Sequence, residues 1–128
     1  MAYYFSKTLK TSFDDAVTRV TQGLQKAEFG ILTIIDVKDT IKKKLNVDFR
    51  NYMILGACHP VTAHQAFQAE ERIGLLLPCN VIVREIADGV VEVAAVDPGA
   101  TMTVVKNPKL NAVAGKVRIK LKAAIDNL

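Results

Sequence analysis

The apolar positions of the chain repeat with two different spacings, which predict alternating strands and helices. Residues 2–9 are rich in aromatic side chains and have the period of two that is typical of a strand. Ser12 then begins a helix, because a serine side chain accepts a hydrogen bond from the free amides of a first turn. We expect Gly30 to end this helix in the left-handed conformation. The apolar face of the helix consists of Phe13, Val17, Val20, Leu24 and Ala27.

The middle of the chain predicts a second strand followed by a short helix. Residues 31–37, with the sequence ILTIIDV, are apolar on both faces, which favours a central strand. Asp39 is expected to begin the short helix, in which Ile41 and Leu45 lie one turn apart. The three lysines at 42–44 are expected to face solvent.

A third strand and a third helix are predicted next. Residues 50–59 form the strand, in which Gly56 indicates a bulge or the close approach of another group. Thr62 and Gln65 have the spacing of a capping box, which predicts a helix over residues 63–74.

The last third of the chain predicts a hairpin and a long helix. Residues 78–86 and 90–96 are apolar strands joined by Asp88-Gly89, a strong signal for a tight turn. Asn107-Pro108 opens the final helix with a cap and a first-turn proline. The buried stripe of that helix consists of Leu110, Val113, Val117, Leu121 and Ile125.

The order strand, helix, four strands with helical insertions, and helix predicts an α+β fold in a single domain, residues 1–128. We expect one curved, mainly antiparallel sheet with the long first and last helices on one face. The last two strands, however, carry valine and alanine on both faces. A monomer would leave the second face exposed, so we expect a homodimer in which a second copy covers it.

Composition narrows the class of protein. Half of the 128 residues are apolar, which excludes a disordered chain. No apolar run is long enough to span a bilayer and the N-terminus has no leader pattern, so we expect a cytoplasmic protein that does not enter membranes. The net charge is +4, but no aromatic residues are interleaved with the basic ones, so binding of nucleic acid is not expected.

The chemically distinctive residues lie in two short stretches. Cys58 is followed by His59 and Pro60, and Cys79 directly follows another proline. Thiolate and imidazole suit zinc or another thiophilic metal, so Cys58, His59 and Cys79 are the candidate metal ligands. Alternatively, Cys58 is a reactive thiol near a helix N-terminus with His59 as its base. The structural alternative is that both cysteines are small buried apolar residues.

The segments ILGACHP, GLLLPCNVIVRE and VDP together resemble a bacterial and archaeal family catalogued as domain of unknown function 302. The resemblance implies an α+β fold similar to that of the TATA-binding protein, and it implies no reaction. It also implies that the antiparallel meander extends back to the third strand. One edge of the sheet would then carry the candidate site, which consists of Cys58, His59, Cys79, Asn80 and Asp97.

These observations predict a dimeric ligand-binding or accessory module rather than an enzyme, with no cofactor required. The first alternative is a thiol-dependent redox or metal-handling protein that uses Cys58, His59 and Cys79. The weaker alternative is a nucleic-acid binder that uses the lysines of the second and last helices. Any small-molecule ligand is beyond what the sequence identifies.

Overall fold

The computed structural model describes residues 2–128, and its elements follow the predicted order. The strands are β1 (Tyr4–Leu9), β2 (Gly30–Asp36), β3 (Tyr52–Cys58), β4 (Cys79–Ala87) and β5 (Val90–Val96). The helices are α1 (Phe13–Lys26), α2 (Val37–Leu45), α3 (Pro60–Ala69), α4 (Pro98–Thr101) and α5 (Pro108–Asp126). Two short 3-10 turns, η1 (Ile73–Leu76) and η2 (Met102–Val105), complete the described chain. None of the described helices is both long and apolar enough to cross a membrane.

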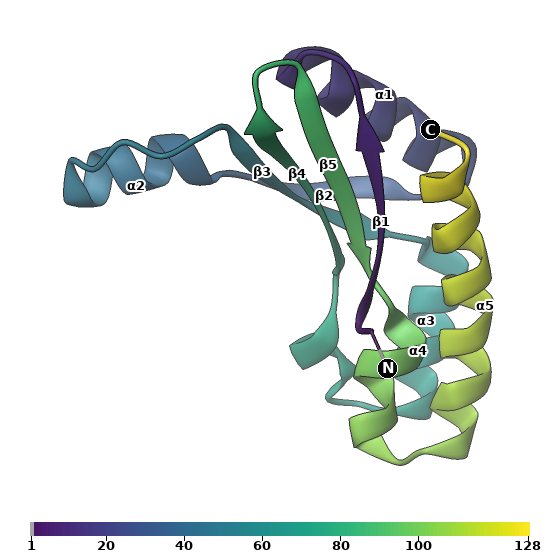
Figure 1. Ribbon diagram of the computed structural model, residues 1–128. Helices are drawn as coiled ribbons and strands as arrows, with labels where there is room; N and C mark the ends of the chain where they lie inside the picture. Colours follow the sequence, from purple (N-terminus) through teal and green to yellow (C-terminus); the bar gives the residue numbers. More distant parts are fainter. Residues whose placement is uncertain (1) are drawn as a thin grey trace.

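The strands form one sheet in the order β1-β5-β4-β3-β2, and every neighbouring pair is antiparallel. Helices α1 and α5 lie on the same side of this sheet (Figure 1). This arrangement confirms the predicted α+β fold class. The tight turn at Asp88-Gly89 is also confirmed, because it joins β4 to β5 and Gly89 has a φ of 73°, a conformation that favours glycine.

The core lies between the sheet and these two helices. Alternate valines of β4 and β5 point into it, and the predicted apolar stripes of α1 and α5 cover them. The central members of this cluster are Val81, Val83, Val91, Val93, Val20, Leu24, Leu121 and Ile125. Each of them is almost completely buried, so the hydrophobic effect favours docking of the helices onto this face.

The prediction that the second strand is central was wrong. β2 pairs with β3 on one side and stands at the edge of the sheet, so most of its apolar side chains are exposed. Helix α2 follows it and has no buried residue. In Figure 1, β2 and α2 extend away from the layer formed by α1 and α5. The apolar residues on both faces of β2 therefore belong to an uncovered edge strand and not to a buried central strand.

The predicted boundaries of the first two helices also differ from those in the structure. α1 ends at Lys26, and the left-handed residue after it is Glu28, with a φ of 68°, whereas Gly30 begins β2. The short helix is capped by Asp36, whose carboxylate accepts a hydrogen bond from the Asp39 amide at 3.0 Å. In both cases the chain turns earlier than the sequence pattern indicated.

The third helix begins at Pro60 and ends at Ala69, so no capping box forms between Thr62 and Gln65. Its cap is His59, a residue that the sequence analysis had assigned to the strand. Proline suits the first turn because its missing N–H would have no partner there. The helix therefore starts at the proline that had been expected to end the strand.

The expected close approach at Gly56 is present. A β-carbon at this position would overlap the hydroxyl of Thr33 and would lie 2.7 Å from Cγ of Pro78. The register of β2 shifts between Ile31 and Thr33, directly opposite Gly56. Glycine is therefore required here because β2 and the start of β4 crowd the strand between them.

Candidate functional site

The antiparallel register gathers the predicted site residues at one end of the sheet. Ala57 is the cross-strand partner of Cys79, so Cys58 lies one residue beyond that pair. Gly56 pairs with Asn80, and Val81 pairs with Ala95, which brings Asp97 to the same end. The backbone therefore collects these residues, but their side chains enter different surroundings.

A cavity of about 270 Å³ lies beside Cys58, His59 and Cys79. Helix α3, η1, helix α5 and the end of the sheet line it, it is open to solvent on one side, and its lining is almost entirely apolar. The walls include Phe29, Leu32, Phe67, Leu77, Met102 and Val113. Concave apolar sites with a few polar groups are where proteins most often bind small molecules.

His59 is buried and has a structural task at the start of α3. Its Nδ1 accepts a hydrogen bond from the backbone amide of Thr62 at 3.4 Å and lies 3.0 Å from the Thr62 hydroxyl. The ring also packs edge-on against Phe29, with ring centroids 5.5 Å apart. With Nδ1 at the cap, Nε2 is the ring nitrogen that lies outside it.

Both cysteines are thiols without a disulfide. Burial raises the pKa of the Cys58 thiol above its ordinary value. Burial, with a smaller effect from Cys58, raises the pKa of the Cys79 thiol to about 11. A reactive thiol needs the opposite direction, because the thiolate is the nucleophile. These thiols are therefore neutral at physiological pH.

The described residues contain no group of three histidine, cysteine or acidic side chains arranged to hold a metal ion. Cys58, His59 and Cys79 line the same cavity, but Nδ1 of His59 is directed to the α3 cap. The chemistry of these three side chains fits a mainly apolar pocket better than an ion site.

Asn80 is exposed and belongs to the opposite face of the sheet, because successive strand residues alternate between faces. There it lines a shallow depression with Tyr4, Tyr52 and Arg84. Arg84 forms an ion pair with Glu92, with Nε 2.6 Å from the carboxylate oxygen. Asn80 is thus separated by the sheet from the cavity that Cys79 lines.

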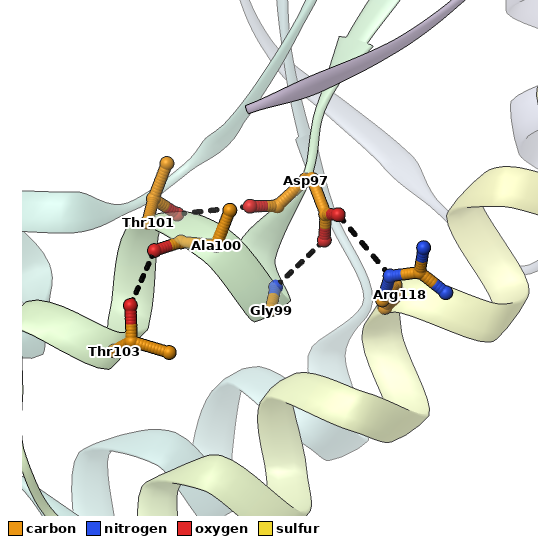
Figure 2. A network of polar contacts seen from close by, with 6 residues as sticks. All are labelled: Asp97, Gly99, Ala100, Thr101, Thr103 and Arg118. Carbon is orange, nitrogen blue, oxygen red and sulfur yellow. Dashed lines mark hydrogen bonds and ion pairs between the residues drawn. The ribbon is translucent and has the colours of Figure 1, made fainter. Parts of the chain in front are cut away.

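Asp97 is buried and fully engaged in structural contacts (Figure 2). One carboxylate oxygen accepts a hydrogen bond from the Gly99 amide at 2.9 Å, and the other lies 3.1 Å from Nε of Arg118. Its own amide donates to the carbonyl of Tyr3 at 2.6 Å. Asp97 therefore joins β1, α4 and α5 and does not face the cavity.

Comparison with known proteins bears on the whole chain. A family model described as "Domain of unknown function DUF302" matches residues 5–128. The chain belongs to this family. A solved structure of an uncharacterized conserved DUF302 protein from Bacillus stearothermophilus is 22% identical, with a TM-score of 0.90 over 98% of each chain. No curated protein matches the chain.

The DUF302 fold assembles the cavity largely from residues that sequence reasoning had assigned to packing or had not considered. Val113 and Val117 were read only as part of the buried stripe of α5, and Phe67 was not expected at a site. One signal was present: Phe67 is flanked by Ala63, Ala66 and Gly74, whose small side chains leave space around an aromatic ring. The small neighbours indicate free space beside the Phe67 ring, but only the three-dimensional arrangement shows that this space is a cavity.

Proposed function

We propose that this DUF302 chain is a ligand-binding module whose site is the apolar cavity between α3, α5 and the end of the sheet. The observation that carries the proposal is a concave, apolar lining that meets one oriented polar group, His59. The adjacent thiols of Cys58 and Cys79 support a reducing compartment, and we place the protein in the cytoplasm.

The cavity defines the ligand class. Its volume of about 270 Å³ suits a small molecule, since typical sites for drug-sized ligands range from roughly 300 to 1,000 Å³. The apolar walls favour a hydrocarbon or aromatic body. Nε2 of His59, the ring nitrogen outside the cap, favours a ligand with one polar group, and its N–H tautomer would pair with an acceptor such as a carbonyl oxygen.

A thiol-dependent reaction is a weaker explanation of the same residues. Both cysteine pKa values are raised, so the thiolate fraction at neutral pH is below that of an ordinary cysteine. Neutral thiols instead behave as small apolar groups and extend the lining of the cavity. Binding therefore accounts for the buried cysteines with no added reaction.

The proposal is tested by NMR titration with acetophenone and with ethylbenzene, which differ mainly in the carbonyl acceptor. We expect both to shift the methyl signals of Val113 and Val117, with acetophenone binding several-fold more tightly because a net hydrogen bond contributes about 1 kcal/mol. Absence of any shift at millimolar concentrations would contradict the proposal.

A matched pair of variants locates the site. Ala63→Leu adds bulk to the cavity wall and should abolish binding, while Gln68→Leu adds an apolar side chain to an exposed position of the same helix and should leave binding unchanged. Circular dichroism checks that both variants fold. Equal affinity in the two variants would place the binding site elsewhere.

A further inference from the structure

Six of the exposed large apolar side chains lie on one segment, which we call the arm: β2, α2 and the following residues 46–51. Exposed large apolar residues lie along its whole length. Their exposed fractions are 64% for Leu32, 66% for Ile34, 46% for Ile35, 69% for Leu45, 50% for Val47 and 42% for Phe49. Because neighbouring strand residues alternate between faces, Ile34 and Ile35 lie on opposite faces of the sheet, so exposed apolar side chains flank the β2 edge on both sides.

The outer edge of β2 has only one of the features that normally prevent strands from pairing with other chains, the irregularity between Ile31 and Thr33. Its sequence, GILTIID, contains no lysine and no proline, and its first charged residue is Asp36 at the very end. Natural edge strands are usually protected by such residues or by a covering helix or loop. The single irregularity of β2 lies between Ile31 and Thr33, which leaves the apolar stretch after it in regular pairing with β3.

The arm is held firmly in place. Arg50 pairs with Glu85 at 3.1 Å and with Asp88 at 3.4 Å, and the Glu85 amide donates to the Asn51 carbonyl at 2.9 Å. At its other end, β2 is paired along its inner edge with β3. The apolar surface is therefore presented by an ordered part of the fold, which limits the entropy lost when a partner docks.

From these observations we infer that a second copy of this chain docks on the arm, with the two β2 strands pairing antiparallel about a two-fold axis. An antiparallel strand edge is complementary to itself, because a two-fold axis perpendicular to the sheet brings each strand opposite its own copy. The sheet then continues from one protomer into the next. Leu32 and Ile34 of each chain become buried at the centre of the interface.

The available area agrees with a dimer. Taking about 150–200 Å² for a whole large apolar side chain, the six exposed residues present on the order of 600 Å². A standard stable interface buries about 800 Å² on each partner, part of it polar. The exposed apolar area of the arm is therefore of the same order as one side of such an interface.

The charges of the arm also fit a second copy. Both signs occur around the exposed apolar residues, because the lysine run 42–44 is partly balanced by the ion pairs Lys42–Asp48 at 3.0 Å and Lys43–Asp39 at 2.8 Å. A surface with both signs interspersed matches its own two-fold copy, whereas a nucleic acid or an anionic membrane favours one sign. The second copy is therefore the occupant that this surface fits.

The sequence located the expected dimer interface on the open face of β4 and β5, and the exposed apolar surface favours a different place. The open face carries Asn80 and the ion pair between Arg84 and Glu92, and its Ala94 is almost buried by larger neighbours. The edge of β2 has more uncovered apolar surface and free backbone groups. We therefore assign the interface to the arm.

The test is sedimentation equilibrium of the full chain, whose mass is 14.0 kDa. We expect the wild type to sediment at twice that mass at micromolar concentrations. Ile34→Lys should raise the dimer dissociation constant at least a hundredfold, because it places a charge at the buried centre. Ser6→Lys, at an exposed position of the opposite edge strand β1, should leave the dissociation constant unchanged.

Ile34 is largely exposed in the protomer, so its replacement should leave the fold intact, which far-ultraviolet circular dichroism checks. If that variant fails to fold, Leu45→Lys on α2, also exposed, replaces it and should weaken the dimer at least tenfold. A wild type that stays at 14.0 kDa up to about 100 μM would overturn the inference. So would a folded Ile34→Lys variant that dimerises normally, or a monomeric wild type that binds phosphatidylcholine vesicles through the arm.

Discussion

Strands β1 and β2 are the two edges of the same sheet, and the chain covers only one of them. In β1, Lys7 donates hydrogen bonds to the carbonyls of Asp126 and Leu128 at the end of α5, and Phe5 packs beneath Arg118, whose guanidinium lies 5.2 Å from the ring centroid. In β2, by contrast, Leu32, Ile34 and Ile35 are largely exposed.

This difference shows how the residue pattern of an edge strand depends on what covers its faces. In YFSKTL the exposed and the covered positions alternate, which suits a strand with one wet face and one covered face. GILTIID has no such alternation, although it stands at an edge. An edge without polar alternation has to be covered by something outside its own chain, and the following predictions test the two edges separately.

The largest effect is expected where β5 ends and β1 begins. Asp97→Ala removes the hydrogen bond to the Gly99 amide and leaves Arg118 without its buried partner. We expect the free energy of unfolding to fall by about 3 kcal/mol, as measured by urea denaturation. Glu92→Ala, which breaks the more exposed ion pair with Arg84, is the matched control and should cost about 1 kcal/mol. A larger loss in the control would contradict the anchoring role of Asp97.

The next effect concerns Cys79, in the interior strand that separates the two edges. Its pKa is raised to about 11 in the folded state, so the unfolded chain loses the thiol proton first as pH rises. Stability linked to this thiol is therefore complete below pH 9 and is lost between about pH 9 and pH 11, by roughly 2 kcal/mol.

The measurement is urea denaturation from pH 8 to pH 11, compared between the wild type and Cys79→Ala. The variant should show a smaller decrease over this range, and the difference between the two curves isolates the thiol from the titration of lysines. Cys58→Ala is the control and should keep most of the decrease, because burial has a larger effect on the Cys79 pKa than Cys58 does. Parallel curves for wild type and Cys79→Ala would contradict the account.

The smallest effect is expected at Lys7, which connects the edge strand β1 to the C-terminal end of α5. Lys7→Met keeps the aliphatic part of the side chain and removes the hydrogen bonds to two carbonyls. We expect a loss of about 1 kcal/mol and faster amide exchange over residues 124–128. Lys10→Met, at an exposed position just beyond β1, should change neither quantity. Unchanged exchange in Lys7→Met would show that β1 does not depend on this contact.

Local sequence signals predicted most of the fold. The stripe from Leu110 to Ile125, the turn at Asp88-Gly89 and the crowding at Gly56 each depend on interactions between residues close in sequence or on a steric requirement of one residue. The position of β2 depends on sheet order, which is decided by long-range pairing. Its apolar character was therefore visible in the sequence, but its edge position was not.

The sequence predicted where in the fold the candidate site lies, but it did not predict what its side chains do. The register placed Cys58, Cys79, Asn80 and Asp97 at one end of the sheet, as the family resemblance implied. Their side chains nevertheless point in different directions. Neighbouring strand residues face opposite sides of the sheet, and the Asp97 carboxylate pairs with Arg118. The cavity was missed because Phe67 and Val113 come from different helices that meet only in the folded chain.

The central claim, that the arm is covered by a second copy, is tested most directly by amide hydrogen exchange of both edge strands at several protein concentrations. The account predicts that protection of residues 30–36 in β2 increases as concentration rises through the dimer dissociation constant, while protection of residues 4–9 in β1 stays constant. Ile34→Lys should abolish that dependence. Exchange in β2 that is fast and independent of concentration, while sedimentation still reports a dimer, would place the interface elsewhere and contradict the account.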